Sequence, residues 1–224
     1  MKRNTIFMLA IIGGLLVASV IYVIVAINML RQSLPEVVID GASGYASTVA
    51  PDSHRLTNPA ESEAVFVEFL DFECEACALA YTYVETLRAE FGDRVTFVIR
   101  YFPLPAHANS ENAAIAVEAA GRQGKLVEMY QRMFETQDEW GEQQDSKGAL
   151  FRDYAEQLGL DMTQYDADVA DPRTLERVQA DLKAGIALGV TGTPSIFVND
   201  RPVKLGAYGD MRKVLVDALE SSGS

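Results

Sequence analysis

The sequence predicts an α/β fold in which a parallel strand–helix–strand unit and a late pair of strands are separated by a helical insertion, preceded by one N-terminal transmembrane helix. Three observations predict this fold. Residues 6–30 form a long apolar run, residues 64–104 follow a strand–helix–strand pattern, and residues from about 109 to 189 carry helical periodicity with little strand signal. Strand-forming residues return after Pro194, which indicates the last strands.

The length and net charge of the chain limit the functions that it can have. The 224 residues are 49% hydrophobic and 23% charged, which is enough for one globular domain with a sizeable core. The net charge is −13, and because Lys2 and Arg3 precede the apolar run, the part after it carries 17 basic against 32 acidic residues. This acidity argues against nucleic acid or an anionic membrane surface as a partner. We interpret it as keeping an exported domain soluble.

The apolar run at the N-terminus indicates a membrane anchor. From Ile6 to Leu30 the only ionisable side chain is the phenol of Tyr22, and about 25 apolar residues can cross a bilayer as a tilted helix. Because Lys2 and Arg3 flank its start, the positive-inside rule places the N-terminus in the cytoplasm. A cleaved signal peptide is the alternative, but its apolar region is usually about 7 to 15 residues long and ends at a small-residue site.

The predicted organisation therefore has four parts. A linker rich in Ser, Pro, Gly and Ala follows the anchor and separates it from the folded domain. The parts are a cytoplasmic N-terminus (1–5), a transmembrane signal anchor (6–30), an extracytoplasmic linker (31–60) and a single domain (61–224). Outside the cytoplasm, paired cysteines meet an oxidising environment.

The first half of the domain has the pattern of a βαβ unit. "AVFVEFLDF" (64–72) is apolar on both alternating faces, as expected of a central strand covered on both sides, and it contains Glu68. A helix begins at Cys77 by its apolar spacing and ends near Gly92. "RVTFVIRYFPL" (94–104) is the second strand, and the handedness rule makes the unit a right-handed parallel crossover.

The second half returns to the sheet after the insertion. "PSIFVND" and "RPVKL" (194–205) form a hairpin in outline, with "NDR" as the turn. Asp210 is placed to cap a final helix. The apolar face of that helix comprises Met211, Val214, Leu215, Ala218 and Leu219.

The two cysteines of the chain, Cys74 and Cys77, lie where the buried strand turns into a helix. A structural zinc site needs four ligands, and the two histidines, His54 and His107, are not at finger-like spacing. Attached haem needs a histidine after the second cysteine, where Ala78 stands, and a structural disulfide here would close too short a loop to stabilise much. We therefore expect no metal and no cofactor other than a redox-active disulfide.

A redox role for the two cysteines has a physical basis. A cysteine at the first turn of a helix faces unpaired backbone N–H groups and the positive end of the helix dipole, which favour the thiolate. Cys74 is therefore the expected nucleophile, and Cys77 is the expected resolving thiol. Glu68, buried in an apolar strand, should have a raised pKa; an edge-strand Glu that points at solvent is the alternative.

Several motifs together resemble the DsbA-like branch of the thioredoxin superfamily, specifically its membrane-anchored bacterial members. They are "HRLTNP", "VEFLDFECEAC", "RYFPLPAH" and "GVTGTPSIFVNDRPV", and the resemblance covers roughly His54 to the C-terminus. It implies a thioredoxin-like fold with Cys74 as the solvent-facing nucleophile, Cys77 as its partner and Glu68 as a buried acid that assists proton transfer. It also implies a cis peptide bond at Thr193–Pro194, with the backbone of Thr193 pairing with an extended substrate.

The chain departs from this family between the cysteines. Strongly oxidising relatives have Pro-His there, whereas this chain has Glu75 and Ala76. With Asp71 and Glu73 close by, like charges are predicted to raise the pKa of Cys74 and to make the disulfide less oxidising. A structural or solvated role is favoured for His107 over a catalytic one.

The sequence thus predicts an extracytoplasmic thiol–disulfide oxidoreductase that acts as a disulfide donor to exported proteins with cysteines. A membrane redox partner would reset its thiols, and a monomer is the default. Three alternatives stay open: a reductase or isomerase, a non-catalytic membrane-tethered binding or chaperone protein, and a surface metal carrier. Nucleic acid is not an expected partner.

Overall fold

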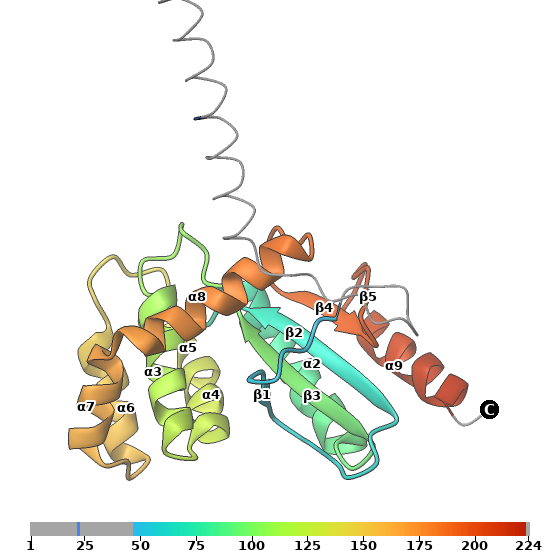
Figure 1. Cartoon of the computed structure of the whole chain (residues 1–224), viewed down its shortest axis with the longest axis horizontal. Helices are drawn as coiled ribbons and strands as arrows, with labels where there is room; N and C mark the ends of the chain where they lie inside the picture. The colour runs from blue at the N-terminus through green and yellow to red at the C-terminus, as the bar shows by residue number, and fades with distance from the viewer. Residues whose placement is uncertain (1–21, 23–46, 223–224) are drawn as a thin grey trace, which may run out of the picture. The chain divides into compact units, whose positions relative to one another are not determined.

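The structure, a computed structural model, describes Tyr22 and residues 47–222 (Figure 1). Apart from Tyr22, the predicted anchor over residues 6–30 lies outside these residues, as do the predicted cytoplasmic N-terminus and the first part of the linker. Within the described part of the chain, no helix has the length and apolar character needed to cross a membrane.

A five-stranded mixed sheet forms the centre of the domain, in the order β1-β3-β2-β4-β5. Its middle strand β2 (Ala64–Leu70) pairs in parallel with β3 (Val95–Tyr101), as predicted. On its other side β2 pairs antiparallel with β4 (Ser195–Val198), and β5 (Arg201–Pro202) follows at the edge. Helix α2 (Glu75–Phe91) makes the crossover from β2 to β3.

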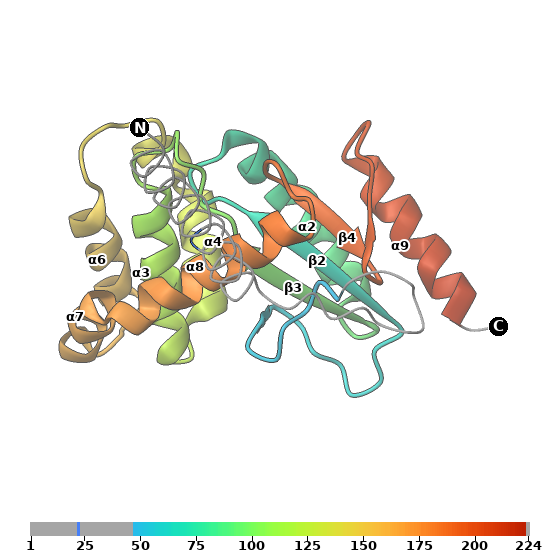
Figure 2. The same ribbon diagram turned by 45° about the horizontal axis from the view of Figure 1, so that its top comes forward.

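The alternating pattern of β2 places its side chains in two separate cores. Phe66 and Leu70 belong to the larger core, which includes the buried residues of α2 and of α9 (Gly209–Ser222). Val67 and Phe69 point to the opposite face, where they pack with residues at the end of α8 (Pro172–Ala187) and after it. Figures 1 and 2 show α8 and α2 on opposite faces of the sheet. Both faces of the central strand are therefore covered, which is why all of its residues except Glu68 are apolar.

The helical insertion lies between β3 and β4 and extends from Ser110 to Ala187, close to the predicted 109–189. It starts with α3 (Ser110–Arg122), α4 (Leu126–Glu135), α5 (Gln137–Trp140), α6 (Gly148–Gln157) and α7 (Met162–Ala170). These helices gather at one end of the sheet, and α8 leads the chain back to it (Figure 1).

The C-terminal hairpin is confirmed, with Asn199 and Asp200 as a two-residue turn at φ 48° and 63°. The final helix is confirmed as well, but Asp210 does not cap it in the predicted way. Its carboxylate reaches back to the N–H groups of Gly206 and Ala207, in the loop before α9. Asp210 thus holds the loop that leads into α9.

The predicted linker up to residue 60 contains folded structure in its described part. β1 (His54–Arg55) pairs antiparallel with β3 and extends the sheet. Further upstream, the N–H and hydroxyl of Thr48 donate to Asp200 at 2.6 and 2.7 Å, and Arg100 donates to the Thr48 carbonyl at 2.7 Å. The folded unit therefore starts well before residue 61, because β1 extends the sheet beside β3 and Thr48 is bonded to the β4–β5 turn and to Arg100.

Candidate active site

Cys74 and Cys77 lie at the junction of β2 and α2, as the sequence predicts, and both are free thiols. Cys74 is the N-cap residue of α2, with extended backbone angles (φ −75°, ψ 121°), and Cys77 lies in the first turn. The strand therefore delivers Cys74 directly to the positive end of a 17-residue helix.

The environment of Cys74 stabilises its thiolate. A hydrogen bond from the Cys77 thiol lowers the pKa of Cys74 from 9.0 to about 5 against the opposing effect of burial; the Thr193 hydroxyl and the N–H groups of Cys77 and Ala76 contribute in the same direction. In the neutral form, the Cys74 thiol donates to the Thr193 carbonyl at 3.5 Å, and the Thr193 hydroxyl has no partner among the described residues. Ionisation of Cys74 gives that hydroxyl an acceptor.

The prediction that nearby negative charges raise the pKa of Cys74 does not hold for the net shift, which is downward. The side chain of Glu75 is exposed, where water screens its charge. Its main ionisable neighbour is Glu142, the pKa of which is raised by a hydrogen bond to Glu75. Ala76, the other residue between the cysteines, accepts a hydrogen bond from the Tyr208 hydroxyl through its carbonyl at 3.0 Å. Hydrogen bonds to the Cys74 sulfur thus decide the direction of its pKa shift, rather than the charges of its neighbours in the sequence.

Cys77 and Glu68 form the buried side of the site. Burial raises the pKa of Cys77 well above 9.0, and the charges of Glu68 and Cys74 add to this effect. Glu68 is 1% exposed on the central strand, so it does not point at solvent. Burial, then the charge of Cys74, raises its pKa to about 8, and neither carboxyl oxygen has a hydrogen-bond partner within residues 47–222. Glu68 can therefore hold or release a proton near neutral pH.

The loop before β4 brings a distant segment to the cysteines. The Thr193–Pro194 peptide bond is cis, as the resemblance implies. The Thr193 carbonyl that faces Cys74 lies 119 residues along the chain from it. Thr193 and Pro194 are thus close to the sulfur that exchanges.

Two residues of the insertion support the turn that carries Cys74, and no motif in the sequence indicates them. The side-chain amide of Gln137 donates to the carbonyls of Phe72 and Cys74 at 2.7 and 3.0 Å. The backbone N–H of Asn109 donates to the buried carboxylate of Glu73 at 2.6 Å. Both contacts join residues at least 36 positions apart, so only the folded structure reveals them.

A carboxylate–imidazole pair completes the surroundings of Cys74. The buried carboxylate of Asp71 accepts hydrogen bonds from the N–H groups of Glu73 and Leu104, both at 2.9 Å, and from Nδ1 of His107 at 2.7 Å. The field of the Cys74 thiolate reaches His107. His107 is thus bonded to the residue three positions before Cys74; its structural or solvated role stays a prediction from the sequence.

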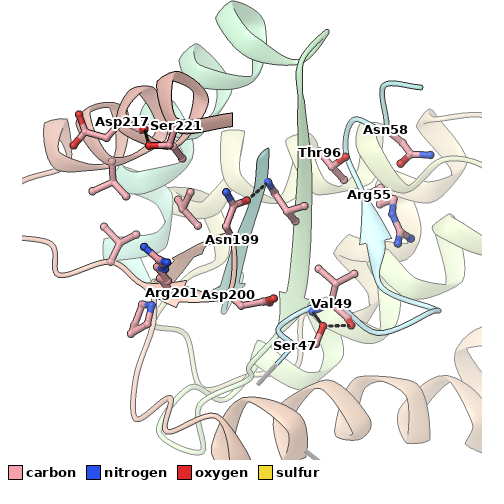
Figure 3. A pocket seen from close by; sticks show the side chains of 16 residues that line it. Ser47, Val49, Arg55, Asn58, Thr96, Asn199, Asp200, Arg201, Asp217 and Ser221 are labelled. Carbon is pink, nitrogen blue, oxygen red and sulfur yellow. Dashed lines mark hydrogen bonds between the residues drawn. The ribbon is translucent and has the colours of Figure 1, made fainter. Parts of the chain in front are cut away.

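A separate groove of about 820 Å³ lies at the other end of β2, beside Val65 (Figure 3). The β4–β5 turn, α9 and the segment before β1 form its walls, and its lining includes Asn199, Asp200 and Ser221. Neither cysteine lines it. Within the described ranges, no group of three His, Cys, Asp or Glu side chains is arranged to hold a metal ion.

Comparisons with known proteins agree with this fold. A family model described as "Thioredoxin" matches residues 54–217. A thioredoxin-like oxidoreductase from Silicibacter pomeroyi DSS-3 is 26% identical, with a TM-score of 0.64 over 76% of this chain and 94% of that one. The fold is also similar to that of alpha-DsbA1 from Wolbachia pipientis, at 18% identity and a TM-score of 0.66 over 78% and 94% of the two chains.

A curated relative extends the comparison to a larger protein. The Na(+)/H(+) antiporter NhaA of Herminiimonas arsenicoxydans is 37% identical over 178 residues, which is 78% of this chain and 26% of the antiporter. The chain thus spans about a quarter of the length of the curated relatives that it matches.

Proposed function

The chain belongs to the thioredoxin family, and on this premise we propose that it is a protein disulfide oxidoreductase that works through Cys74 and Cys77. The DsbA-like resemblance of the sequence is consistent with the fold, because its structural neighbours include alpha-DsbA1 from Wolbachia pipientis. The observation that carries the proposal is the contrast between the two thiols. The pKa of Cys74 is lowered to about 5, while burial raises that of Cys77 far above its ordinary value.

The geometry supports an exchange in two steps. In the disulfide form, a substrate thiolate attacks the sulfur of Cys74, the Cys74–Cys77 bond breaks, and Cys77 leaves as a thiolate. Cys77 then takes up a proton, which the buried carboxyl of Glu68 is placed to supply. A second substrate thiolate attacks the substrate sulfur of the mixed disulfide, and Cys74 leaves as a stabilised thiolate. The substrate gains a disulfide, and the protein gains two electrons and is left as the reduced pair.

The low pKa of Cys74 supports the disulfide-donor direction. A stabilised Cys74 thiolate favours the reduced form of the protein, which makes its disulfide the stronger oxidant. This reverses the less oxidising character that Glu75 suggests from the sequence. We therefore place the reductase or isomerase alternative second.

The proposal extends to location and partners. The substrates are exported proteins with cysteines, bound in extended form against the backbone of Thr193 beside Cys74. Cys74 is only 9% exposed, in contrast to the solvent-facing position that the resemblance implies. The anchor over residues 6–30 holds the domain on the extracytoplasmic side, where a membrane redox partner reoxidises it and it acts as a monomer. The Cys74–Cys77 disulfide is the only redox group that this chemistry needs.

A reduction potential tests the direction. The full-length protein is equilibrated in glutathione or dithiothreitol buffers, and its thiols are counted by the mass added on alkylation. We expect a potential of about −120 to −180 mV, in the range of strong oxidants and isomerases. A potential of about −270 mV, as in thioredoxin, would refute the donor direction and support a reductase.

Two cysteine variants test the chemistry itself. Cys74→Ser should abolish oxidation of a dithiol peptide. Cys77→Ser has no disulfide of its own to donate, so it is mixed with a disulfide-linked peptide dimer; its Cys74 thiolate should attack that disulfide, release one peptide thiol and stay in a mixed disulfide that no Cys77 resolves. If biological activity survives in Cys74→Ser, the chain is a binding or chaperone protein. Purification with one equivalent of zinc or copper would instead support the metal carrier.

A further inference from the structure

The Asp71–His107 pair is held rigidly beside the nucleophile. Asp71 is 2% exposed, and two of its three hydrogen bonds come from backbone N–H groups, so its carboxylate cannot turn away from the imidazole. His107 is fixed by its own backbone as well, since its N–H donates to the Leu104 carbonyl at 3.0 Å and its carbonyl accepts from the Ser110 hydroxyl at 3.2 Å. The same stretch positions the nucleophile, because the N–H of Cys74 donates to the Asp71 carbonyl at 3.2 Å.

The charged groups that act on His107 favour its cation. They are Asp71, Glu73 and Cys74 from the segment between β2 and α2, and Glu142 from the loop after α5. Burial opposes the charge on the imidazole, but the hydrogen bond and charge of Asp71, and then the charges of Cys74 and Glu73, raise the pKa of His107 above 6.5. An imidazolium therefore persists beside the redox site toward neutral pH.

The other groups around Cys74 supply no second cation of this kind. The Cys77 thiol and the Thr193 hydroxyl are neutral groups that lower the pKa of Cys74, while Glu68 and Tyr208 are acids. The positive end of the helix dipole acts on Cys74 itself, and the His107 imidazolium is held on the carboxylate of Asp71, three positions before Cys74 in the sequence.

We propose that His107 is a positioning residue for the Cys74 thiolate, held by Asp71, so that the protonation state of its ring sets how stable that thiolate is. The inference rests on the proposed function and deepens it, because it assigns His107 to the step in which Cys74 leaves the mixed disulfide. With the ring protonated, the Asp71–His107 pair is neutral overall. When the ring loses its proton, the pair carries one negative charge, which repels the departing thiolate and raises the pKa of Cys74.

Thermodynamic linkage means that the coupling between His107 and Cys74 can be measured on either residue. If the His107 cation stabilises the Cys74 thiolate, the thiolate must stabilise the cation by the same free energy. The pKa of His107 must therefore be higher in the reduced protein than in the disulfide form, where Cys74 carries no charge. A ring with a purely structural role would titrate alike in both forms.

The first experiment follows the imidazole Cε1–H resonances of the full-length protein in detergent micelles as a function of pH, in the reduced and the oxidised form. His54, on β1, is an internal control. Its ring is also paired with a carboxylate, that of Glu118 at 2.5 Å, but not with the Asp71 segment. We expect the pKa of His107 to be at least about 0.5 unit higher in the reduced protein, below the ~1 to 3 units of an opposite charge in direct contact. Any difference between the two forms should be confined to the His107 resonance. Equal values for His107 in the two forms overturn the proposal.

Variants test the same coupling from the side of Cys74. His107→Gln should raise the pKa of Cys74, read from the pH dependence of alkylation by iodoacetamide, by about 0.5 unit, which is a threefold loss of thiolate at acidic pH. His107→Lys, which restores a cation, should bring the pKa of Cys74 back, and the matched control His54→Gln should leave it unchanged. An unaltered Cys74 pKa in His107→Gln overturns the proposal.

The outcomes separate this inference from the proposed function. If the wild-type protein oxidises no dithiol peptide but the pKa of His107 still differs between the redox forms, the function fails and the coupling stands. If the protein is active and the pKa of His107 is the same in both forms, the function stands and the coupling fails.

Discussion

Replacing Glu68 with glutamine should remove a large dependence of stability on pH. The carboxyl has a pKa of about 8 in the folded protein and an ordinary value of 4.5 in the unfolded chain. Since the folded protein binds this proton more tightly, the contribution of Glu68 to stability is fully present below pH 4.5. It is lost as the pH rises through 8.

The expected size follows from the two values. Each pH unit in this window costs about 1.4 kcal/mol, so stability falls by about 5 kcal/mol between pH 4.5 and 8, and by about 3 kcal/mol up to pH 7. Glutamine has the same shape and no proton to lose. The free energy of unfolding of Glu68→Gln minus that of the wild type should therefore increase across the window by these amounts.

Urea unfolding of the reduced proteins, at closely spaced pH values with a phosphine reductant, measures this difference. Subtracting the wild-type curve removes the contributions of other titrating groups. Glu61→Gln, at an exposed position just before β2, is the matched control and should follow the wild type at every pH. A constant difference between Glu68→Gln and wild type from pH 4.5 to 8 would refute the idea that Glu68 is buried as a neutral acid. In the oxidised protein the slope should be smaller, because the charge of Cys74 is the second cause of the raised pKa.

Three further changes test single contacts. Thr193→Val removes a hydroxyl that helps lower the pKa of Cys74, so the pH profile of Cys74 alkylation should shift upward, and an unshifted profile would contradict that role. Gln137→Ala leaves the carbonyls of Phe72 and Cys74 without their donor and should cost about 1 to 3 kcal/mol in urea unfolding. Gln143→Ala, which loses an exposed bond of the same kind, should cost within about 0.5 kcal/mol, and equal losses would count against the contact. Asp181→Asn leaves the buried guanidinium of Arg100 unpaired and should cost about 3 to 5 kcal/mol. Asp166→Asn, at the exposed pair with Arg152, should cost about 1 kcal/mol or less; a similarly small loss in Asp181→Asn would refute the importance of the buried pair.

The sequence predicts the parts of the fold that short-range patterns encode. Alternating apolar residues identify β2 as a strand covered on both faces, and the change from strand to helical spacing places Cys74 at a helix start. The hairpin is predicted for a similar reason, since Asn199 and Asp200 belong to the residue types that tolerate a left-handed backbone.

Other features depend on contacts between distant residues, which such patterns do not encode. The sequence shows Glu75 next to Cys74, and proximity alone predicts a raised pKa. The fold instead turns Glu75 toward solvent and brings Thr193 to the sulfur. The contacts of His107 and Gln137 are not encoded locally either, because their partners lie 36 to 65 positions away. The start of β1 was missed because two strand residues are too few to show a period.

The order of the chain has a consequence for how the protein is made. Cys74 and Cys77 leave the ribosome early, whereas Thr193, which helps to stabilise the Cys74 thiolate, follows 119 residues after Cys74. At about 5 to 20 residues per second, that interval is roughly 6 to 24 seconds. During it, the two thiols lack the Thr193 contact and Gln137 arrives only midway, so the growing chain carries cysteines closer to ordinary reactivity. The special properties of the pair therefore belong to the finished domain, and a chain released before Thr193 would expose both cysteines without them.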